Sequence, residues 1–252
     1  MSVGTKGAEW TGFSLASYAQ LLEPYYLKSL LLTLRLALIS AVIAVVLAIP
    51  VAYTMSRLTS PFVRRIFLAA VLLPLLVNLL LQSYGWLVIL GPGGMLNQAL
   101  MGLGLIKRPI MLLYNQNGVL MGLVQTAFPL AVLPIASAMR GVARTYEEAA
   151  ATLGASRLQV FRQVVLPMSM PGIITGATLV FAYNASSFVV PLLLGGRRVP
   201  MLAVMVHDQI APLMNWPAAS AAGVVLIVTT LAIMTLSEYI TGRRRRMLEA
   251  SQ

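Results

Sequence analysis

The residues best suited to chemistry lie in a polar stretch, from Tyr146 to Pro171, between two apolar segments. Two adjacent carboxylates, Glu147 and Glu148, are followed there by three alanines. Alanine side chains beside carboxylates can enter a groove of another protein with little loss of side-chain entropy. This composition predicts recognition of a partner rather than catalysis.

The local pattern of this stretch predicts a helix, a turn and a second helix. Residues 146–153 are mostly good helix formers, and the acidic pair would lie in the first turn, where the helix dipole favours negative charge. Gly154 is expected to end this helix, because glycine readily adopts the positive φ that often follows a helix terminus. Ser156 can cap a second helix, which Pro167 stops or bends. The apolar stripe expected on that helix comprises Leu158, Phe161, Val164 and Val165.

A second set of candidate residues is polar and lies inside apolar segments. Such side chains are costly in a membrane and usually face the interior of a helix bundle or a wet cavity. We expect this set to include residues of a solute pathway; the alternative is hydrogen bonding between helices, worth ~0.6 kcal/mol per contact. The candidate pathway residues are Asn78, Gln82, Tyr84, Trp86, Gln125, Thr126, Tyr183, Asn184 and Ser187.

The elements that must position both sets are membrane-spanning helices. The chain is 59% hydrophobic and only 10% charged, whereas a soluble domain is about 25% charged. Crossing a bilayer takes about 20 apolar residues in a helix. The sequence therefore predicts an all-α integral membrane protein with five transmembrane helices. The predicted spans are Leu27–Met55, Ile66–Leu90, Gly118–Met139, Pro171–Leu194 and Ala218–Tyr239.

The distribution of positive charge predicts the orientation of these spans. Short cytoplasmic loops carry an excess of Lys and Arg, and arginines gather in segments 57–65, 140–162 and 243–246. These segments are therefore expected inside, with the N-terminus outside and the C-terminus in the cytoplasm. The chain then divides into an extracytoplasmic segment 1–26, a transmembrane domain 27–241 with a loop at about 140–170, and a basic cytoplasmic tail 242–252. Basic clusters beside apolar segments are topology signals, so a nucleic-acid partner is not expected.

In this orientation, segment 195–217 forms a long outer loop. Four of its apolar residues can share one helical face, which would either receive a partner protein or rest on the bilayer. The lone His207 is expected to be solvated rather than a metal ligand, because a metal site needs several ligands. The four apolar residues are Val199, Leu202, Val206 and Ile210.

The spacing of three groups of residues in the polar stretch is not explained by an ordinary interhelical loop. Glu148-Ala149-Ala150 is followed after three residues by Gly154, and after nine more by Val164-Val165-Leu166-Pro167. This spacing resembles the cytoplasmic coupling loop of ABC-importer permease subunits, where such a subunit meets its ATPase. From about Phe13 onward the chain is most similar to the spermidine/putrescine-type branch of the binding-protein-dependent permeases. Further supporting stretches are Phe13–Tyr18, Leu72–Pro74, Gln82–Trp86, Gly118–Pro134 and Asn215–Pro217.

The resemblance implies a type I importer permease core in a bacterial inner membrane, with four kinds of partner. These are an ABC ATPase dimer, an extracytoplasmic solute-binding protein, the lipid bilayer and a second permease. The second permease is expected to be a related but different chain, although a second copy of this chain stays open. Residues implied to couple to the ATPase are Glu147, Glu148, Ala149, Ala150, Gly154, Ala155 and Pro167.

The same resemblance implies that ATP and magnesium bind to the partner ATPase and that this chain holds no cofactor. The sequence agrees, because it has no Gly-x-x-x-x-Gly-Lys-Ser/Thr segment that could cradle phosphates. Relatives with six spans have one more helix before the point where this sequence begins. Either the five-helix core inserts with its N-terminal segment outside, or a leading helix is missing from this sequence.

The implied substrate is a small organic solute, and a polyamine is the leading expectation. No Asp or Glu lies deep in a predicted span, so a polyamine would pass over amides, hydroxyls and aromatic faces by cation–π attraction. The branch also includes importers of other organic cations, phosphonates and opine-like compounds, which leaves the exact substrate open.

Two other functional classes fit the composition but not the spacing of the polar stretch. An ATP-independent secondary carrier or channel would also be an apolar helix bundle, but no internal repeat supports it. A membrane enzyme would need a His–carboxylate cluster, metal-ligand spacing or a nucleophile beside a base, and the sequence suggests none of these. Neither class explains the coupling spacing, so we expect a transport subunit without catalytic activity.

Overall fold

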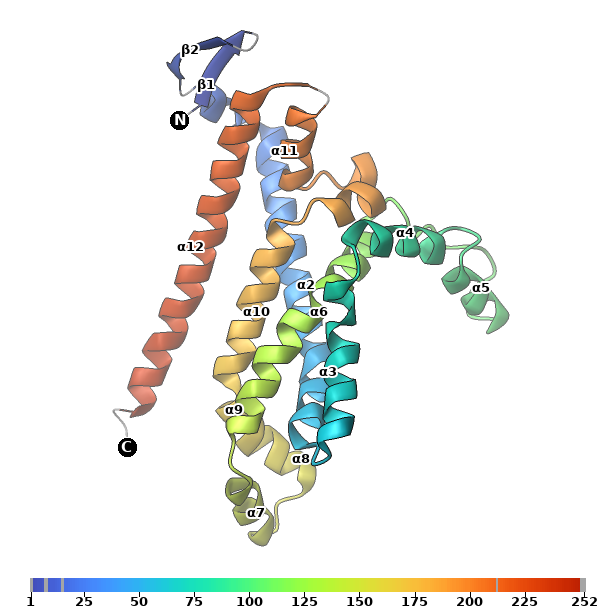
Figure 1. Ribbon diagram of the computed structural model, residues 1–252, viewed down its shortest axis with the longest axis vertical. Coiled ribbons are helices and arrows are strands. Elements are labelled where there is room, and N and C mark those ends of the chain that lie inside the picture. Colours follow the sequence, from blue (N-terminus) through green and yellow to red (C-terminus); the bar gives the residue numbers. More distant parts are fainter. Residues whose placement is uncertain (1, 7–8, 15, 212, 250–252) are drawn as a thin grey trace. The chain divides into compact units, whose positions relative to one another are not determined.

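The structure is a computed structural model that describes residues 2–6, 9–14, 16–211 and 213–249, with side-chain burial for 17–19, 21–211 and 213–237 (Figure 1). Helices dominate this part of the chain, which confirms the predicted all-α membrane fold. The α-helices are α1 Ala16–Gln20, α2 Pro24–Arg57, α3 Pro61–Leu76, α4 Leu79–Leu90, α5 Met95–Gly102, α6 Gln116–Gly141, α7 Arg144–Thr152, α8 Arg157–Val160, α9 Leu166–Met168, α10 Met170–Ala185, α11 Leu202–Ile210 and α12 Trp216–Glu249. Three short helical segments of other types are η1 Phe161–Val165, η2 Pro191–Gly195 and η3 Gly196–Arg198.

A small antiparallel hairpin at the N-terminal end is the exception to the helical fold. Strands β1, Ser2–Lys6, and β2, Glu9–Ser14, pair Val3 with Phe13 and Thr5 with Trp10. Valine, threonine and aromatic residues favour strands. The hairpin was not predicted within segment 1–26, of which residues 1, 7–8 and 15 lie outside the described part.

Within the described residues, four helical stretches are long and apolar enough to cross a membrane. A fifth crossing is counted if two helices bent by 66° relative to each other, Arg157–Met168 and Met170–Ala185, form one span. This agrees with the predicted number of five. The four stretches are Pro24–Arg57, Leu79–Gly102, Gln116–Gly141 and Trp216–Ser237.

The predicted second span, Ile66–Leu90, is wrong as a single helix. It divides into α3 and α4 at Val77, whose backbone is extended, with φ −83° and ψ 138°. The side-chain Oδ1 of Asn78 accepts a hydrogen bond of 2.9 Å from the backbone N–H of Leu80. Asparagine side chains that bond nearby backbone compete with helix continuation. The sixteen residues of α3 span only about 24 Å.

The predicted fourth span, Pro171–Leu194, is also interrupted. Helix α10 ends at Ala185, a non-helical link of residues 186–188 follows, and helical backbone resumes at Val189 before η2 begins at Pro191. Proline has no backbone N–H and is best tolerated in the first turn of a helix. Pro191 lies in the first turn of this new helical segment, and Ser187 lies in the link.

Long helix α2 presents two distinct faces. One face is buried and built from small residues, which permits close helix packing in a membrane, and the opposite face exposes large apolar side chains, as a surface towards lipid or a partner requires. The buried small residues are Ala37, Ala41, Ala44, Ala48 and Ala52, and the exposed ones include Leu31, Leu38, Val42 and Val46.

The chain forms two compact units, and the first contains residues 1–37, 83–119 and 185–252. In this unit α11 packs on α12 with a core of Leu21, Leu202, Ala203, Met205, Ala221, Ala222 and Leu226. Val206 packs partly buried against this core, and Val199 is also buried. The apolar face predicted to meet a partner or the bilayer is thus largely used inside the unit, because an apolar helix face can equally cover a neighbouring helix.

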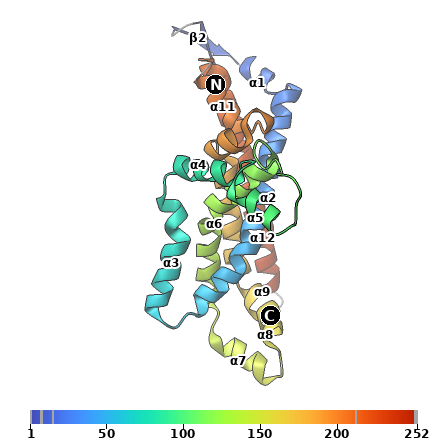
Figure 2. The same ribbon diagram turned by 90° about the vertical axis from the view of Figure 1, so that its right-hand side faces the viewer.

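The second unit contains residues 38–82 and 120–184. It combines the second half of α2 with α3, most of α6, the three short helices α7 to α9, and α10. In both views α7 and α8 lie at the end of this unit where α6 ends (Figures 1 and 2). The polar stretch of the sequence analysis is therefore a protruding structure at one end of the unit.

The predicted cytoplasmic tail 242–252 continues α12 as far as Glu249. Its arginine side chains and residues 250–252 lie outside the described part of the chain.

Candidate functional site

The first arm of the candidate coupling segment is α7, and its end is closed by backbone hydrogen bonds. Gly154 has φ +85°, and its N–H donates to the carbonyl of Ala151 at 3.0 Å while the N–H of Ala155 donates to the carbonyl of Ala150 at 3.1 Å. This pair of bonds is the Schellman motif, in which a left-handed residue satisfies the last free carbonyls of a helix. The predicted stop at Gly154 is confirmed.

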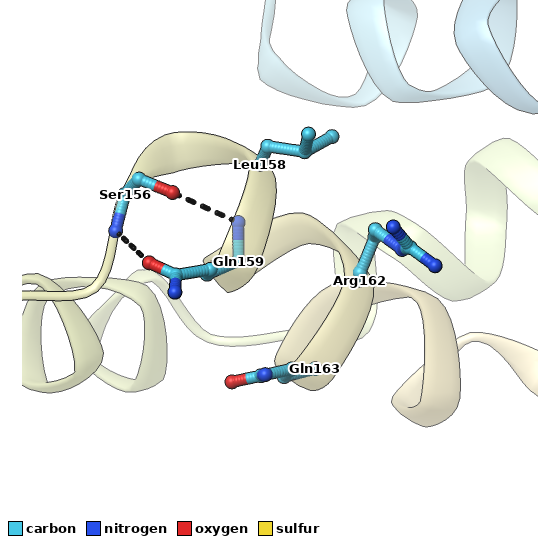
Figure 3. A pocket seen from close by; sticks show the side chains of 5 residues that line it. All are labelled: Ser156, Leu158, Gln159, Arg162 and Gln163. Atoms are coloured by element: carbon cyan, nitrogen blue, oxygen red, sulfur yellow. Dashed lines mark hydrogen bonds between the residues drawn. The ribbon is translucent and has the colours of Figure 1, made fainter.

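The second arm begins at Ser156, as predicted. The Ser156 hydroxyl accepts from the backbone N–H of Gln159 at 3.4 Å, and the Gln159 side chain accepts from the backbone N–H of Ser156 at 2.7 Å. Figure 3 shows these two bonds, which form a capping box at the start of α8. The bend to α10 comes at Ser169, two residues after Pro167, which occupies the first turn of α9.

The buried face of the second arm differs from the predicted stripe. Val160 and Val165 are buried, whereas the Leu158 side chain is 65% exposed. The cause is η1, a π-helical segment from Phe161 to Val165. A π turn contains more residues than an α turn, so the buried Val160 and Val165 are five residues apart. Phe161 and Val164 of the predicted stripe stay partly buried, and only Leu158 leaves it.

The two adjacent carboxylates of α7 have different surroundings. Glu147 forms an ion pair with Arg57, the last residue of α2, and both side chains are 19% exposed. Nη1 of Arg57 also donates to the carbonyl of Val142 at 3.4 Å. Glu148 is exposed, with exposed Ala149 beside it. Of the predicted coupling residues, Glu147 is therefore bound within the chain and Glu148 faces outward.

A second contact joins α2 to the other arm. The guanidinium carbon of Arg57 lies 5.8 Å from the centre of the Tyr53 ring, within cation–π range. The Tyr53 ring meets the Phe161 ring edge-on, with centres 5.0 Å apart and an interplanar angle of 69°. The last turn of α2 thus contacts α7 through Arg57 and η1 through Tyr53.

Exposed apolar side chains accompany the exposed carboxylate on this segment. Leu153 is 89% exposed, and Tyr146 and Leu158 are also more than half exposed. Beside Leu158 is an open hollow of about 470 Å³ lined by Ser156, Leu158, Gln159, Arg162 and Gln163 (Figure 3). Large exposed apolar side chains with polar neighbours are typical of interaction sites. Ala150 and Ala155 are half-buried, and Pro167 is exposed.

Two candidate pathway residues lie at the break between α3 and α4. Nε2 of Gln82 donates to the carbonyls of Pro74 and Val77, the latter at 3.0 Å, while Asn78 caps the start of α4. A break in a membrane helix leaves backbone groups that must find partners within the protein. Gln82 and Asn78 satisfy such groups.

Two further candidates are buried between or within helices. Asn184 is completely buried, and its Nδ2 donates to Oγ of Ser40 on α2 at 2.8 Å. Thr126 is buried and bonds the carbonyl of Gly122 on its own helix at 2.9 Å. Both arrangements match the alternative of helix stabilisation. The other candidates all have accessible surface: Asn78 and Tyr84 are exposed, Tyr84 to 56%, and Gln82, Trp86, Gln125, Tyr183 and Ser187 are half-buried.

Comparison with known proteins agrees with this arrangement. The family model "Binding-protein-dependent transport system inner membrane component" matches residues 30–246. The chain belongs to this family. It is a multi-pass inner-membrane permease of an ABC importer, not an enzyme.

The permease is similar along almost its whole length to a named relative and to solved structures. It is 33% identical over 236 residues to the spermidine/putrescine transport system permease protein PotB of Salmonella typhimurium strain SL1344, which covers 94% of this chain and 80% of PotB. A bacterial ABC transporter involved in the import of the acidic polysaccharide alginate has a TM-score of 0.77 at 18% identity, covering 94% of this chain and 85% of that one. The alginate transporter in complex with an alginate pentasaccharide-bound periplasmic protein has a TM-score of 0.76, also at 18% identity, covering 92% and 83%.

Asn97 is among the buried polar residues of the permease that sequence reasoning missed. Asn97 on α5 is completely buried and makes three hydrogen bonds: to the carbonyls of Gly91 and Ile110, at 3.0 and 3.1 Å, and from the N–H of Ile110, at 2.8 Å. It holds together a segment that reads as a featureless loop. The amide directly after two apolar residues, Met95 and Leu96, was the available signal.

Proposed function

We propose that this permease imports a polyamine of the spermidine/putrescine type, driven by a separate ABC ATPase that docks on the segment α7–Gly154–α8. A second permease, related to this chain but different from it, completes the pathway. The polyamine assignment is supported by the 33% identity to PotB over 94% of the chain.

The observation that carries the coupling proposal is the surface of α7. Glu148, Ala149 and Leu153 are exposed together, and the Schellman motif at Gly154 holds them in a defined turn. Small side chains and an ordered backbone leave little conformational entropy to lose on docking. An apolar side chain as exposed as Leu153 gains free energy when a partner covers it.

The proposed pathway uses aromatic and neutral polar groups. The accessible candidates include two tyrosines, Tyr84 and Tyr183, whose ring faces attract ammonium groups. A pathway of this kind holds a polyamine weakly, which favours passage. Recognition of the solute then rests with an extracytoplasmic binding protein, a partner of the kind present in the alginate transporter complex.

In the first experiment the permease is tagged and its complex is extracted in mild detergent. Native mass spectrometry then determines which proteins co-purify and in what stoichiometry. We expect two ATPase copies and one second permease per permease. Recovery of the permease alone, in a detergent that preserves such assemblies, would contradict the coupling proposal and favour an ATP-independent carrier or channel. Two permease copies without a related chain would contradict the heterodimer.

The second experiment tests the solute. The purified complex is reconstituted into liposomes with its binding protein, and uptake of radiolabelled spermidine and putrescine is measured with and without ATP. We expect uptake only with ATP, and competition by unlabelled polyamines but not by phosphonates. ATP-driven uptake of a phosphonate with no polyamine uptake would retain the importer and refute the polyamine assignment.

A further inference from the structure

One helical turn of α2 contacts both arms of the segment that the proposed function assigns to ATPase docking. We infer that Tyr53 and Arg57 are positioning residues that make the inner end of α2 move together with α7 and η1. We name Tyr53, Arg57, Glu147 and Phe161 the α2 clamp. All four belong to the second compact unit.

The charges of the clamp are placed where helix ends favour them. Arg57 is the last residue of α2, and Glu147 lies in the first turn of α7. A cation is stabilised at a helix C-terminus and an anion at a helix N-terminus. Each charge therefore suits its own helix as well as its partner, so two charge–dipole interactions and one ion pair stabilise this junction of two helix ends.

The clamp also fixes the direction in which each arm is held. The guanidinium of Arg57 binds the carboxylate of Glu147 and the carbonyl of Val142, so it holds both α7 and the link that precedes it. Tyr53, one turn earlier on α2, meets Phe161 on the second arm. A displacement of either arm is thus transmitted to the last turn of α2, between Tyr53 and Arg57.

This arrangement gives the neighbouring glutamates separate roles. Glu147 is turned towards Arg57, whereas Glu148 is exposed for a partner. The inference rests on the proposed function, because α2 is moved only if the segment receives an ATPase. The inference adds to the proposed function that Glu147 acts inside the permease, whereas Glu148 meets the ATPase.

The test begins with geometry alone, in membranes that contain the full chain without an ATPase. The sequence has no cysteine, so Tyr53→Cys with Phe161→Cys gives a single thiol pair that a short bifunctional thiosulfonate can join. This pair removes the ring contact and leaves the Arg57–Glu147 ion pair to hold the arms. We expect Glu147→Gln to lower the rate of cross-linking about 5-fold, and Glu148→Gln to leave it unchanged. Equal cross-linking rates for the cysteine pair alone, with Glu147→Gln and with Glu148→Gln would refute the inference that the α2 clamp holds the two arms.

The second measurement uses the reconstituted complex and compares solute transported with ATP hydrolysed. Glu147→Gln should retain the ATPase on purification but transport about 5-fold less solute per ATP. The charge swap of Arg57→Glu with Glu147→Arg should recover part of that loss, which a merely destabilised protein would not do. Loss of the ATPase by Glu147→Gln, with Glu148→Gln unaffected, would make Glu147 a docking residue and refute the inference.

These two measurements separate the inference from the proposed function. If the wild-type permease recruits no ATPase, the proposed function fails, and the cross-linking rates still decide whether the clamp exists. If the wild-type complex transports solute with ATP but the Glu147→Gln complex does so with an unchanged ratio, only the clamp fails.

Discussion

At the scale of single residues, polar side chains inside the permease mostly serve its own backbone and helix contacts. Gln82 bonds carbonyls at the α3–α4 break, and Asn184 bonds Ser40 across two helices. An amide in an apolar surrounding must find such partners, since an unpaired polar group there is costly. Recognition of solute is therefore expected from the accessible residues, such as Tyr84 and Tyr183, more than from the buried amides.

Substitutions at Gly154 test the segment α7–Gly154–α8, which we call the docking segment, at the scale of one residue. A Cβ at Gly154 would meet nothing within 4 Å, but its φ of +85° disfavours any side chain, at about 1–2 kcal/mol. We expect Gly154→Ala to lower ATP-coupled uptake while the protein still inserts, and Gly154→Glu to lower it further. Uptake and ATP hydrolysis by the reconstituted complex measure this.

The matched control is Gly141→Ala, because a Cβ at Gly141 also meets nothing within 4 Å and its φ is not positive. This variant should transport at the wild-type rate. Equal loss in both variants would mean that the backbone conformation at Gly154 is not what matters.

At the scale of elements, a close contact in the second unit joins α6 to α10. Gly172 and Gly176 are spaced by four residues on α10, and a Cβ on them would lie 2.6 Å from the carbonyl oxygen of Pro134 and 3.1 Å from that of Ala131. Small residues at this spacing let membrane helices approach closely. The crossing holds in place the helix that follows the docking segment.

The substitution Gly172→Leu should therefore separate α6 from α10. We expect a lower thermal midpoint in detergent and less folded protein, because overpacking of a tight contact costs about 1–3 kcal/mol. Gly223→Leu on α12 is the control, since a Cβ there meets nothing within 4 Å. Fluorescence-detected size exclusion after heating measures both. A stable Gly172→Leu variant would show that the two helices can move apart at little cost.

At the scale of the whole molecule, charge and apolar length together define how the permease lies in the membrane. The net charge of +11 comes from an excess of arginines and lysines over acidic residues. The arginine-rich segments 57–65, 140–162 and 243–246 are expected on the cytoplasmic side. This orientation would put the docking segment where an ATPase can reach it. It would also put segment 91–117 outside.

The orientation can be tested directly because the chain has no cysteine. Leu153 and Leu105 are both strongly exposed, on the docking segment and in segment 91–117. In right-side-out vesicles, a membrane-impermeant maleimide should label Leu105→Cys and spare Leu153→Cys. Inverted vesicles should give the reverse pattern. Labelling of Leu153→Cys from outside would show that the docking segment is not cytoplasmic.

The sequence alone determined those features that depend on local pattern. Apolar length predicted the membrane-spanning helices, because a bilayer sets the number of residues needed to cross it. Local hydrogen bonding determined the turn at Gly154 and the cap at Ser156, because the bonded groups lie within five residues of one another. The spacing of these residues was enough to indicate an importer permease.

Only the tertiary structure decided which side chains meet across the chain. Glu147 and Glu148 are equivalent in the sequence, and the position of Arg57 on another helix distinguishes them. Asn184 finds Ser40 at a distance of 144 residues along the chain. The buried face of α11 likewise depends on the neighbouring helix that its apolar groups contact. Such contacts join residues far apart in sequence, so no local periodicity specifies them.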